Sequence, residues 1–185
     1  YSPGSLLCFA PTRSAMPKPT DIRIVSAAVY FLPVTLRVPL KFGPEITTSV
    51  VCLRTKVRVE DRHGKSAEGW GETPLAVSWT WPCKLSVAER GRRMEEFSVR
   101  LARRLVQFGA WGHPMEIGYD FQKQELGKDE GERRKDEVEM TYLSKLVCLS
   151  AFDIAVHDAF GILHGRDVYE CYGAEFMSRD LADFV

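Results

Sequence analysis

Net charge is absent from this sequence of 185 residues, because 25 Lys and Arg residues balance 25 Asp and Glu residues. A neutral chain has no long-range field that would attract nucleic acid or an anionic membrane surface. The sequence also lacks an uninterrupted apolar run near the roughly 20 residues that a membrane span needs. We therefore predict neither a nucleic-acid partner nor a membrane partner. The hydrophobic fraction of 45% and the charged fraction of 27% are typical of a globular protein.

Cysteine is sparse, and the five cysteines form no C-x-x-C pair and have no His at zinc-ligand spacing. Their odd number and wide separation predict free thiols in a cytoplasmic protein, rather than a disulfide framework or a zinc site. These residues are Cys8, Cys52, Cys83, Cys148 and Cys171. The sequence also lacks a G-x-x-x-x-G-K phosphate loop, a nucleophile elbow and an H-E-x-x-H motif. No independent active site is therefore recognised.

The first 20 residues, YSPGSLLCFAPTRSAMPKPT, do not begin with Met and hold only a five-residue apolar patch among scattered Pro and Ser. A signal peptide needs a longer apolar region that ends at a small-residue cleavage site. We predict a disordered leader over residues 1–20, or residues that precede a true start at Met16.

Three strands are predicted in the first half of the chain. Residues 22–36 are rich in β-branched and aromatic residues, residues 47–61 alternate between apolar and polar positions, and residues 67–72 follow a turn at 62–65. The second and third strands form a hairpin. Two irregular loops with Pro and bulky apolar residues are expected, one between the first two strands and one after the third.

Two helices are predicted in the second half. Ser86 is an N-cap with Glu89 three residues later, apolar residues then recur every three or four positions, and Gly109 ends the helix. A second helix runs from about Glu137 to Leu163. The mixed-charge run Lys123–Glu139 is interpreted as a solvated insertion between helices, with a docking surface as the alternative. Strands followed by helices indicate an α+β fold, a three-stranded antiparallel meander followed by a helical bundle.

The segment SAFDIAVHDAFG places Asp153, His157 and Asp158 within six residues of the second helix. Carboxylates and an imidazole at this spacing suit a metal site or a proton relay. On a helical wheel, however, Asp153 and His157 lie about 100° from Asp158, so the three do not converge. Asp158 falls in an apolar stripe and should be hydrogen-bonded there. The stripe consists of Leu143, Val147, Ala151, Ile154, Ala155, Ala159 and Ile162.

The third strand carries GWGETPL at residues 69–75, and the second helix and its exit read AFDIAVHDAFGILHGRDVYECYG at residues 151–173. With the order of strands and helices, these motifs make the chain resemble the N-terminal capping domain of the enolase superfamily, in its mandelate racemase and muconate lactonizing enzyme branch. The matching positions are Gly69, Gly71 and Glu72 of a G-x-G-E motif, and Asp153, Ile154, Ala155, Asp158, Gly161 and Gly165 of the helix motif. His157, Ile162 and Tyr172 stand where the family usually has Trp, Lys and Leu.

The resemblance implies a capping domain at residues 21–173 and, at residues 174–185, a linker or the start of a missing (β/α) barrel domain. The family abstracts the proton α to a carboxylate with a Lys or His base and holds the enediolate on Mg²⁺. Its bases and metal ligands lie at strand ends of the barrel. The resemblance therefore implies no catalytic residue and no metal ligand in this chain, and assigns Asp153, His157 and Asp158 structural roles.

The implied activity is that of a racemase, a cycloisomerase or an acid-sugar dehydratase, and this chain alone would be inactive. The implied partners are a small carboxylate substrate, the chain's own barrel domain and further copies of the chain in a homo-oligomer. The alternative, from another class, is a non-catalytic α+β module that binds a ligand or a protein.

The family's capping domain closes two loops over the barrel mouth, where they contact the substrate. By position these are Pro39–Ile46 and Thr73–Trp81, which are expected at the same end of the domain. The implied substrate contacts are Leu40, Lys41 and Phe42 in the first loop and Leu75, Trp79 and Trp81 in the second. Packing of Trp79 and Trp81 against the first helix is the alternative. His63 and His113 are expected on the surface, and His164 at a helix end.

Overall fold

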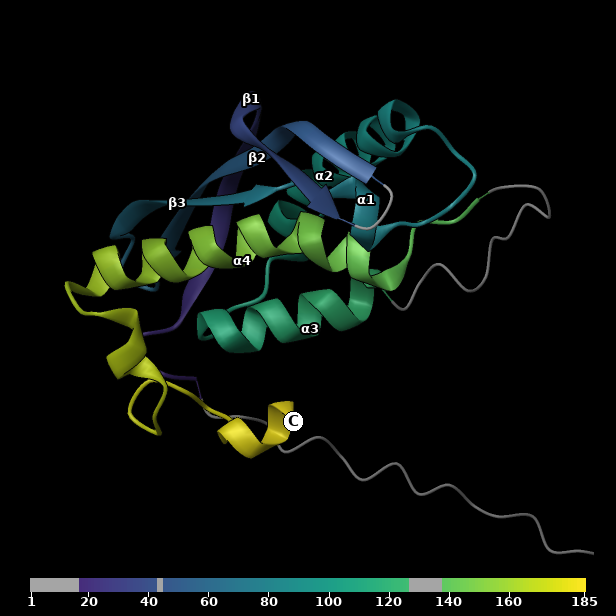
Figure 1. Ribbon diagram of the computed structural model, residues 1–185. Coiled ribbons are helices and arrows are strands. Elements are labelled where there is room, and N and C mark those ends of the chain that lie inside the picture. Colours follow the sequence, from purple (N-terminus) through teal and green to yellow (C-terminus); the bar gives the residue numbers. More distant parts are fainter. Residues whose placement is uncertain (1–16, 43–44, 127–137) are drawn as a thin grey trace, which may run out of the picture.

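The computed structural model describes residues 17–42, 45–126 and 138–185 (Figure 1). Residues 1–16 of the predicted leader and residues 127–137 of the charged run lie outside the described residues. The described chain is layered: helix α4 (Tyr142–His164) packs on an antiparallel sheet, and helix α3 (Pro114–Leu126) packs on the other side of α4. This arrangement confirms the predicted α+β fold.

The sheet has the strand order β1-β2-β3, from β1 (Ile22–Phe42), β2 (Glu45–Asp61) and β3 (Ser66–Pro74). Both neighbouring pairs are antiparallel, as predicted for a meander. The tight turn between β2 and β3 depends on Gly64, whose φ of +82° is a value that glycine adopts without steric strain because it has no Cβ. The Asp61 carboxylate accepts the N–H groups of His63 and Lys65 and so completes the turn.

The first hairpin is longer than predicted, because β1 and β2 continue through most of the expected loop. Leu40 pairs with Thr47, and Lys41 pairs with Ile46. The interpretation of this segment as an irregular loop is therefore wrong. Between the pairs Thr35–Ser49 and Leu40–Thr47, five steps along β1 oppose two along β2. This bulge contains Pro39, which has no N–H to donate to the neighbouring strand and is therefore tolerated at a bulge. The two strands pair again after it, from Leu40 onward.

Helix α2 (Val87–Phe108) has the predicted bounds. The Ser86 side chain accepts the Glu89 N–H at 3.2 Å, and Gly109 adopts φ of +61° at the C-terminal end. Helix α4 begins five residues later than predicted, because Thr141 is its N-cap and accepts the Ser144 N–H. The remaining elements of the described residues are a short helix α1 (Val77–Thr80) and the 3₁₀ turns η2 (Val168–Cys171) and η3 (Leu181–Phe184).

The sequence did not predict α3. Pro114 suits the first position of a helix, but Gly118 and several polar residues interrupt the apolar repeat of this segment. The last turn of α3 contains the start of the charged run, and there Glu125 is buried and accepts a hydrogen bond from Arg104 Nη1 at 2.6 Å. The first residues of the run are therefore part of the packed domain, not of a solvated insertion.

The side of α4 that faces the core is not the predicted apolar stripe. Leu143, Ile154 and Ile162 are exposed, whereas Phe152 and Phe160 are buried in the core. A helical wheel cannot orient this helix, since apolar residues occur on all its sides. Within the described residues, α4 also has the length and composition that would allow a helix to cross a membrane, but it packs between the sheet and α3 in the manner of a core helix.

Candidate functional site

Strand β3 and helix α4 approach so closely that only glycine fits at two positions of the strand. A Cβ at Gly69 would lie nearer than 3.0 Å to backbone atoms of Ala155 and Ala159, and a Cβ at Gly71 would clash in the same way with Ala151. These three alanines are four residues apart and so face the strand together. The G-x-G-E motif and the helix motif are thus the two sides of one contact.

Two hydrogen bonds hold this contact in register. Asp158 Oδ2 accepts the Trp70 N–H at 2.8 Å, and Thr55 Oγ1 donates to the Ala151 carbonyl at 2.7 Å. Asp158 is therefore hydrogen-bonded as predicted, although it lies at an exposed edge rather than inside an apolar stripe. Its carboxylate satisfies an outward N–H of β3, the last strand of the described sheet.

Asp153 and His157 lie on another side of α4, as the helical wheel predicted. His157 Nδ1 is 2.8 Å from the Asp153 carbonyl and 3.6 Å from Asp153 Oδ1. Neither residue meets Asp158, which binds β3 instead. Among the residues that the structure describes, no group of three or more His, Cys, Asp or Glu side chains is placed to hold a metal ion.

His113 is fully buried, so its expected surface position is wrong. Its Nδ1 accepts the Met115 N–H at 3.2 Å, and its ring packs edge-on against Phe160 and Tyr172. Burial, together with the nearby His157 and His164, lowers the pKa of His113 to about 4. No sequence pattern indicates this burial, because His113 directly precedes α3, which lacks a regular apolar repeat.

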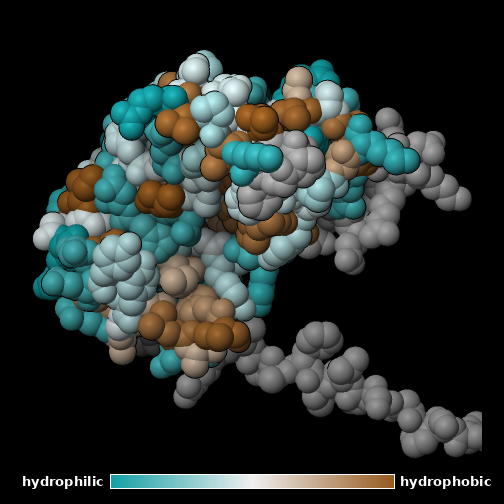
Figure 2. Space-filling model, in the orientation of Figure 1, coloured by the Kyte–Doolittle hydropathy of each residue, from teal (hydrophilic) through white to brown (hydrophobic). Residues whose placement is uncertain are grey.

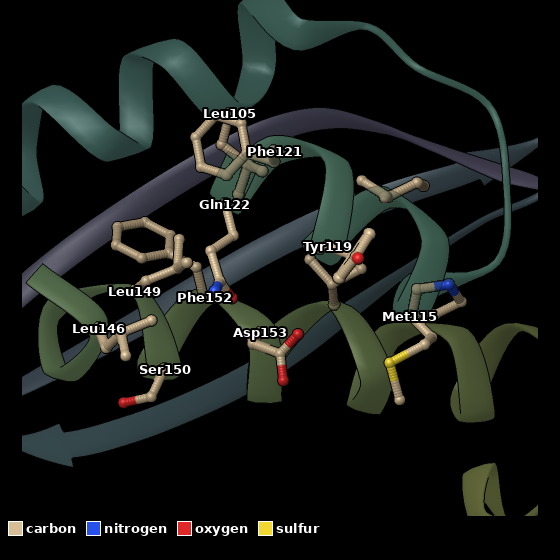
Figure 3. A pocket seen from close by; sticks show the side chains of 14 residues that line it. Leu105, Met115, Tyr119, Phe121, Gln122, Leu146, Leu149, Ser150, Phe152 and Asp153 are labelled. Carbon is tan, nitrogen blue, oxygen red and sulfur yellow. The ribbon is translucent and has the colours of Figure 1, made fainter. Parts of the chain in front are cut away.

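A groove of about 360 Å³ separates α3 from α4 (Figure 3). Most of its lining is apolar, and Figure 3 shows Met115 and Tyr119 of α3 across from Asp153 of α4. Asp153 is the one charged residue in this lining, and it lies beside Gly118, where a Cβ would approach its Oδ1 within 2.9 Å. The groove suits the burial of an apolar group. It does not present a nucleophile with a neighbouring base, which catalysis would need.

The two predicted capping segments do lie at the same end of the sheet. Strand β3 ends with Pro74 opposite Cys52, and the next residue, Leu75, donates its N–H to the Val51 carbonyl at 2.8 Å. The hairpin of β1 and β2 continues beyond this point to Glu45. Leu40 and Lys41 are exposed near its tip, whereas the side chain of Phe42 lies outside the described residues.

The second segment is only partly open. Trp79 is 48% exposed, whereas Trp81 is 1% exposed and Leu75 is also buried. Arg90 of α2 donates to the Trp81 carbonyl at 2.7 Å, so this end of the segment is fixed to the core. The structure thus corrects the expected positions of Leu75 and Trp81, which cannot line an open loop. The burial of Trp81 agrees with the alternative packing interpretation, whereas Trp79 is half-exposed.

No protein-family model matches this chain, and no curated protein matches its sequence. The L-Ala-D/L-Glu epimerase from Bacillus subtilis is a similar solved structure, with a TM-score of 0.51 and 16% identity over 82% of this chain and 34% of the epimerase. The L-talarate/galactarate dehydratase from Salmonella typhimurium LT2 gives a TM-score of 0.52 and 19% identity over 94% of this chain and 37% of the dehydratase. A mutant of that dehydratase, liganded with Mg and L-glucarate, gives a TM-score of 0.51.

This chain therefore spans about a third of the length of the structures it resembles. The likeness shows a shared fold, a three-stranded antiparallel meander followed by helices, with part of the epimerase and part of the dehydratase. The resemblance that the two motifs indicated is confirmed at the level of the fold.

Proposed function

We propose that this chain is the substrate-capping domain of a longer, Mg²⁺-dependent enzyme of the enolase superfamily, one that abstracts the proton α to a carboxylate. The observation that carries the proposal is that two segments with exposed apolar and cationic side chains emerge at one end of a fold shared with an epimerase and a dehydratase. Racemase, cycloisomerase and acid-sugar dehydratase activities all belong to this reaction class.

In this proposal the chain's own residues cover the substrate rather than react with it. Leu40 at the hairpin tip and Trp79 in α1 provide apolar surface that excludes water, and Lys41 provides a cation for a remote carboxylate or hydroxyl of the substrate. The reacting groups belong to the barrel domain that would follow. The proposed setting is the cytoplasm.

The described residues do not fit a Mg²⁺ site, since a Mg²⁺ ion needs converging oxygen ligands and no such cluster occurs among them. In this proposal the ion is bound by the barrel. We expect titration calorimetry of the 185-residue chain with MgCl₂ to show no binding at micromolar concentrations. A micromolar dissociation constant would contradict this assignment of the metal.

The reading frame beyond Val185 provides the first test. We expect about 200 further residues, with a K-x-K motif and then Asp, Glu and Glu at successive strand ends of a barrel. The longer protein should exchange the α-proton of a small carboxylate with D₂O in the presence of Mg²⁺, followed by NMR across dipeptides and acid sugars. A stop codon directly after Val185, or a longer protein without exchange on any of these carboxylates, would contradict the proposal.

The groove between α3 and α4 favours a second candidate, a non-catalytic module that binds a ligand or a protein. Its volume of about 360 Å³ and its mostly apolar lining are in the range of small-molecule pockets. A stop codon directly after Val185 would favour this candidate over the enzyme.

A further inference from the structure

The groove between α3 and α4 combines an apolar lining with one charged residue, Asp153. Figure 3 shows Leu146 and Leu149 to one side of Asp153 along α4. They precede Asp153 by seven and four residues, so the apolar part begins one helical turn from the carboxylate and continues for a second turn. The residues that line this apolar part are Leu105, Phe121, Leu146, Leu149 and Phe152.

The Asp153 carboxylate is available to a ligand. Its side chain is 51% exposed, and within the described residues no donor lies within hydrogen-bond distance of its oxygens. His157 Nδ1 is 2.8 Å from the Asp153 carbonyl oxygen but 3.6 Å from Oδ1, which is longer than a hydrogen bond. A carboxylate beside apolar surface favours a donor or a cation as its partner.

Gly118 of α3 keeps the space beside this carboxylate open. Any larger residue there would place its Cβ 2.9 Å from Asp153 Oδ1. Glycine weakens a helix relative to alanine, and this close approach explains its presence within α3. One turn further along α3, the Gln122 side chain donates to the Tyr142 hydroxyl at 2.9 Å and joins the two helices. This hydrogen bond helps to fix their spacing, so the groove is preformed.

The dimensions of the groove limit the size of its ligand. A volume of about 360 Å³ is in the range of small-molecule pockets. The positions of Leu149 and Leu146 allow an apolar body that extends about 6 to 10 Å from the group bound to Asp153. Figure 2 shows hydrophobic side chains among hydrophilic ones on the face where α3 and α4 lie. An anionic ligand would be repelled by Asp153, whereas a cationic one is complementary to it.

We propose that this groove binds a small primary amine with an aromatic or branched aliphatic body. The ammonium group donates charge-assisted hydrogen bonds to the Asp153 carboxylate, and the apolar body lies between Phe121 and Leu149, where it displaces water from the lining. The inference rests on the second candidate function, whose ligand class it names, and not on the capping role. Its failure would therefore leave the test by α-proton exchange unaffected.

Titration of the isotope-labelled 185-residue chain with phenethylamine, followed by NMR at neutral pH, tests the ligand class. We expect the amide signals of Gly118 and Asp153 to shift, with a dissociation constant in the millimolar range or below. Phenethyl alcohol, in which a neutral hydroxyl replaces the ammonium group, should bind about tenfold more weakly or worse. Equal affinities would overturn the amine assignment and keep the groove as an apolar ligand site. Binding of neither compound would overturn the inference and also remove the groove as support for the second candidate function.

Two variants test the residues of the site. Asp153→Asn keeps the shape of the side chain and removes its charge, so it should raise the dissociation constant for phenethylamine about tenfold or more. Gly118→Ala should also weaken binding, because its methyl group would occupy the space beside Oδ1, and it decides the matter if Asp153→Asn does not fold. Unchanged affinity in both variants would overturn the proposal.

Glu96→Gln is the matched control for Asp153→Asn. Glu96 is an exposed carboxylate of α2 that lies outside the groove, so its replacement changes the net charge by the same amount. This control should leave the dissociation constant unchanged. If it weakens binding as much as Asp153→Asn does, the amine is attracted by net charge alone and the proposed site is wrong.

Discussion

His113 shows how a single side chain can make the stability of this domain depend on pH. The imidazole is fully buried, its Nδ1 is used by the Met115 N–H, and its Nε2 has no hydrogen-bond partner within the described residues. Burial and the neighbouring His157 and His164 favour the neutral ring and lower its pKa to about 4 from an ordinary value of 6.5. The folded protein therefore resists a proton that the unfolded chain accepts readily.

We predict that the free energy of unfolding decreases as the pH falls from about 6.5 to about 4. In this interval the unfolded state binds a proton at His113 and the folded state does not, so stability is complete above the interval and its loss levels off below it. The loss should reach about 3 kcal/mol. Urea unfolding at a series of pH values measures it. His113→Leu should reduce this slope but not abolish it, because burial also lowers the pKa of His164. Identical slopes in the variant and the wild type would contradict the prediction.

At the scale of elements, β3 and α4 approach each other closely at Gly69 and Gly71. This contact requires two glycines on the strand and small residues every fourth position on the helix. We predict that Gly69→Ala or Gly71→Ala destabilises the domain by about 3 kcal/mol or more, because the added methyl group meets helix backbone that cannot move aside. Chemical denaturation of each variant provides the measurement.

Gly91→Ala is the control for these substitutions. Gly91 lies within α2 and has open space around the position of a Cβ. The same chemical change there should stabilise the domain by about 1 kcal/mol, because Ala has the higher helix propensity. Equal effects at Gly69 and Gly91 would show that α4 does not approach β3 as closely as described.

The elements differ in how well their sequences predict them. Helix α2 carries both of its end signals, Ser86 and Gly109, and one apolar face, so its bounds follow from the sequence. Helix α3 has neither a polar N-cap signal nor a regular apolar repeat, and its position depends on contacts with distant residues such as Arg104. Helix α4 is predicted in type but not in rotation, because nothing in an all-apolar helix distinguishes its buried side.

The candidate site was predictable in place but not in detail. An antiparallel meander necessarily brings the end of β3 and the β1–β2 hairpin to one end of the sheet, so the position of the two capping segments follows from topology. Which side chains face outward depends on packing. Trp79 and Trp81 are two residues apart in an apolar stretch, yet the short helix α1 turns one outward and the other into the core.

At the scale of the whole molecule, these two tryptophans separate substrate contact from core packing. If the chain is part of the longer enzyme that we propose, Trp79→Ala in that enzyme should raise KM or change substrate preference with little loss of stability, because its side chain is exposed at the proposed barrel mouth. Trp81→Ala should cost about 3 to 5 kcal/mol of stability and leave specificity unchanged. Melting curves and steady-state kinetics of both variants provide the test. Native KM and specificity in Trp79→Ala would remove this residue from the capping surface.

Because α4 covers β3, the order in which the ribosome makes these two elements affects folding during synthesis. Ala159 follows Gly69 by 90 residues, so the ribosome makes the entire sheet well before the helix that covers it. At a synthesis rate of about 5–20 residues per second, the apolar side of the sheet stays exposed for roughly 5 to 20 seconds before α4 has been made. A nascent chain with an uncovered sheet is a substrate for chaperones that hold exposed apolar segments. Slow translation between β3 and α4 should therefore lower the yield of folded protein more than slow translation after α4.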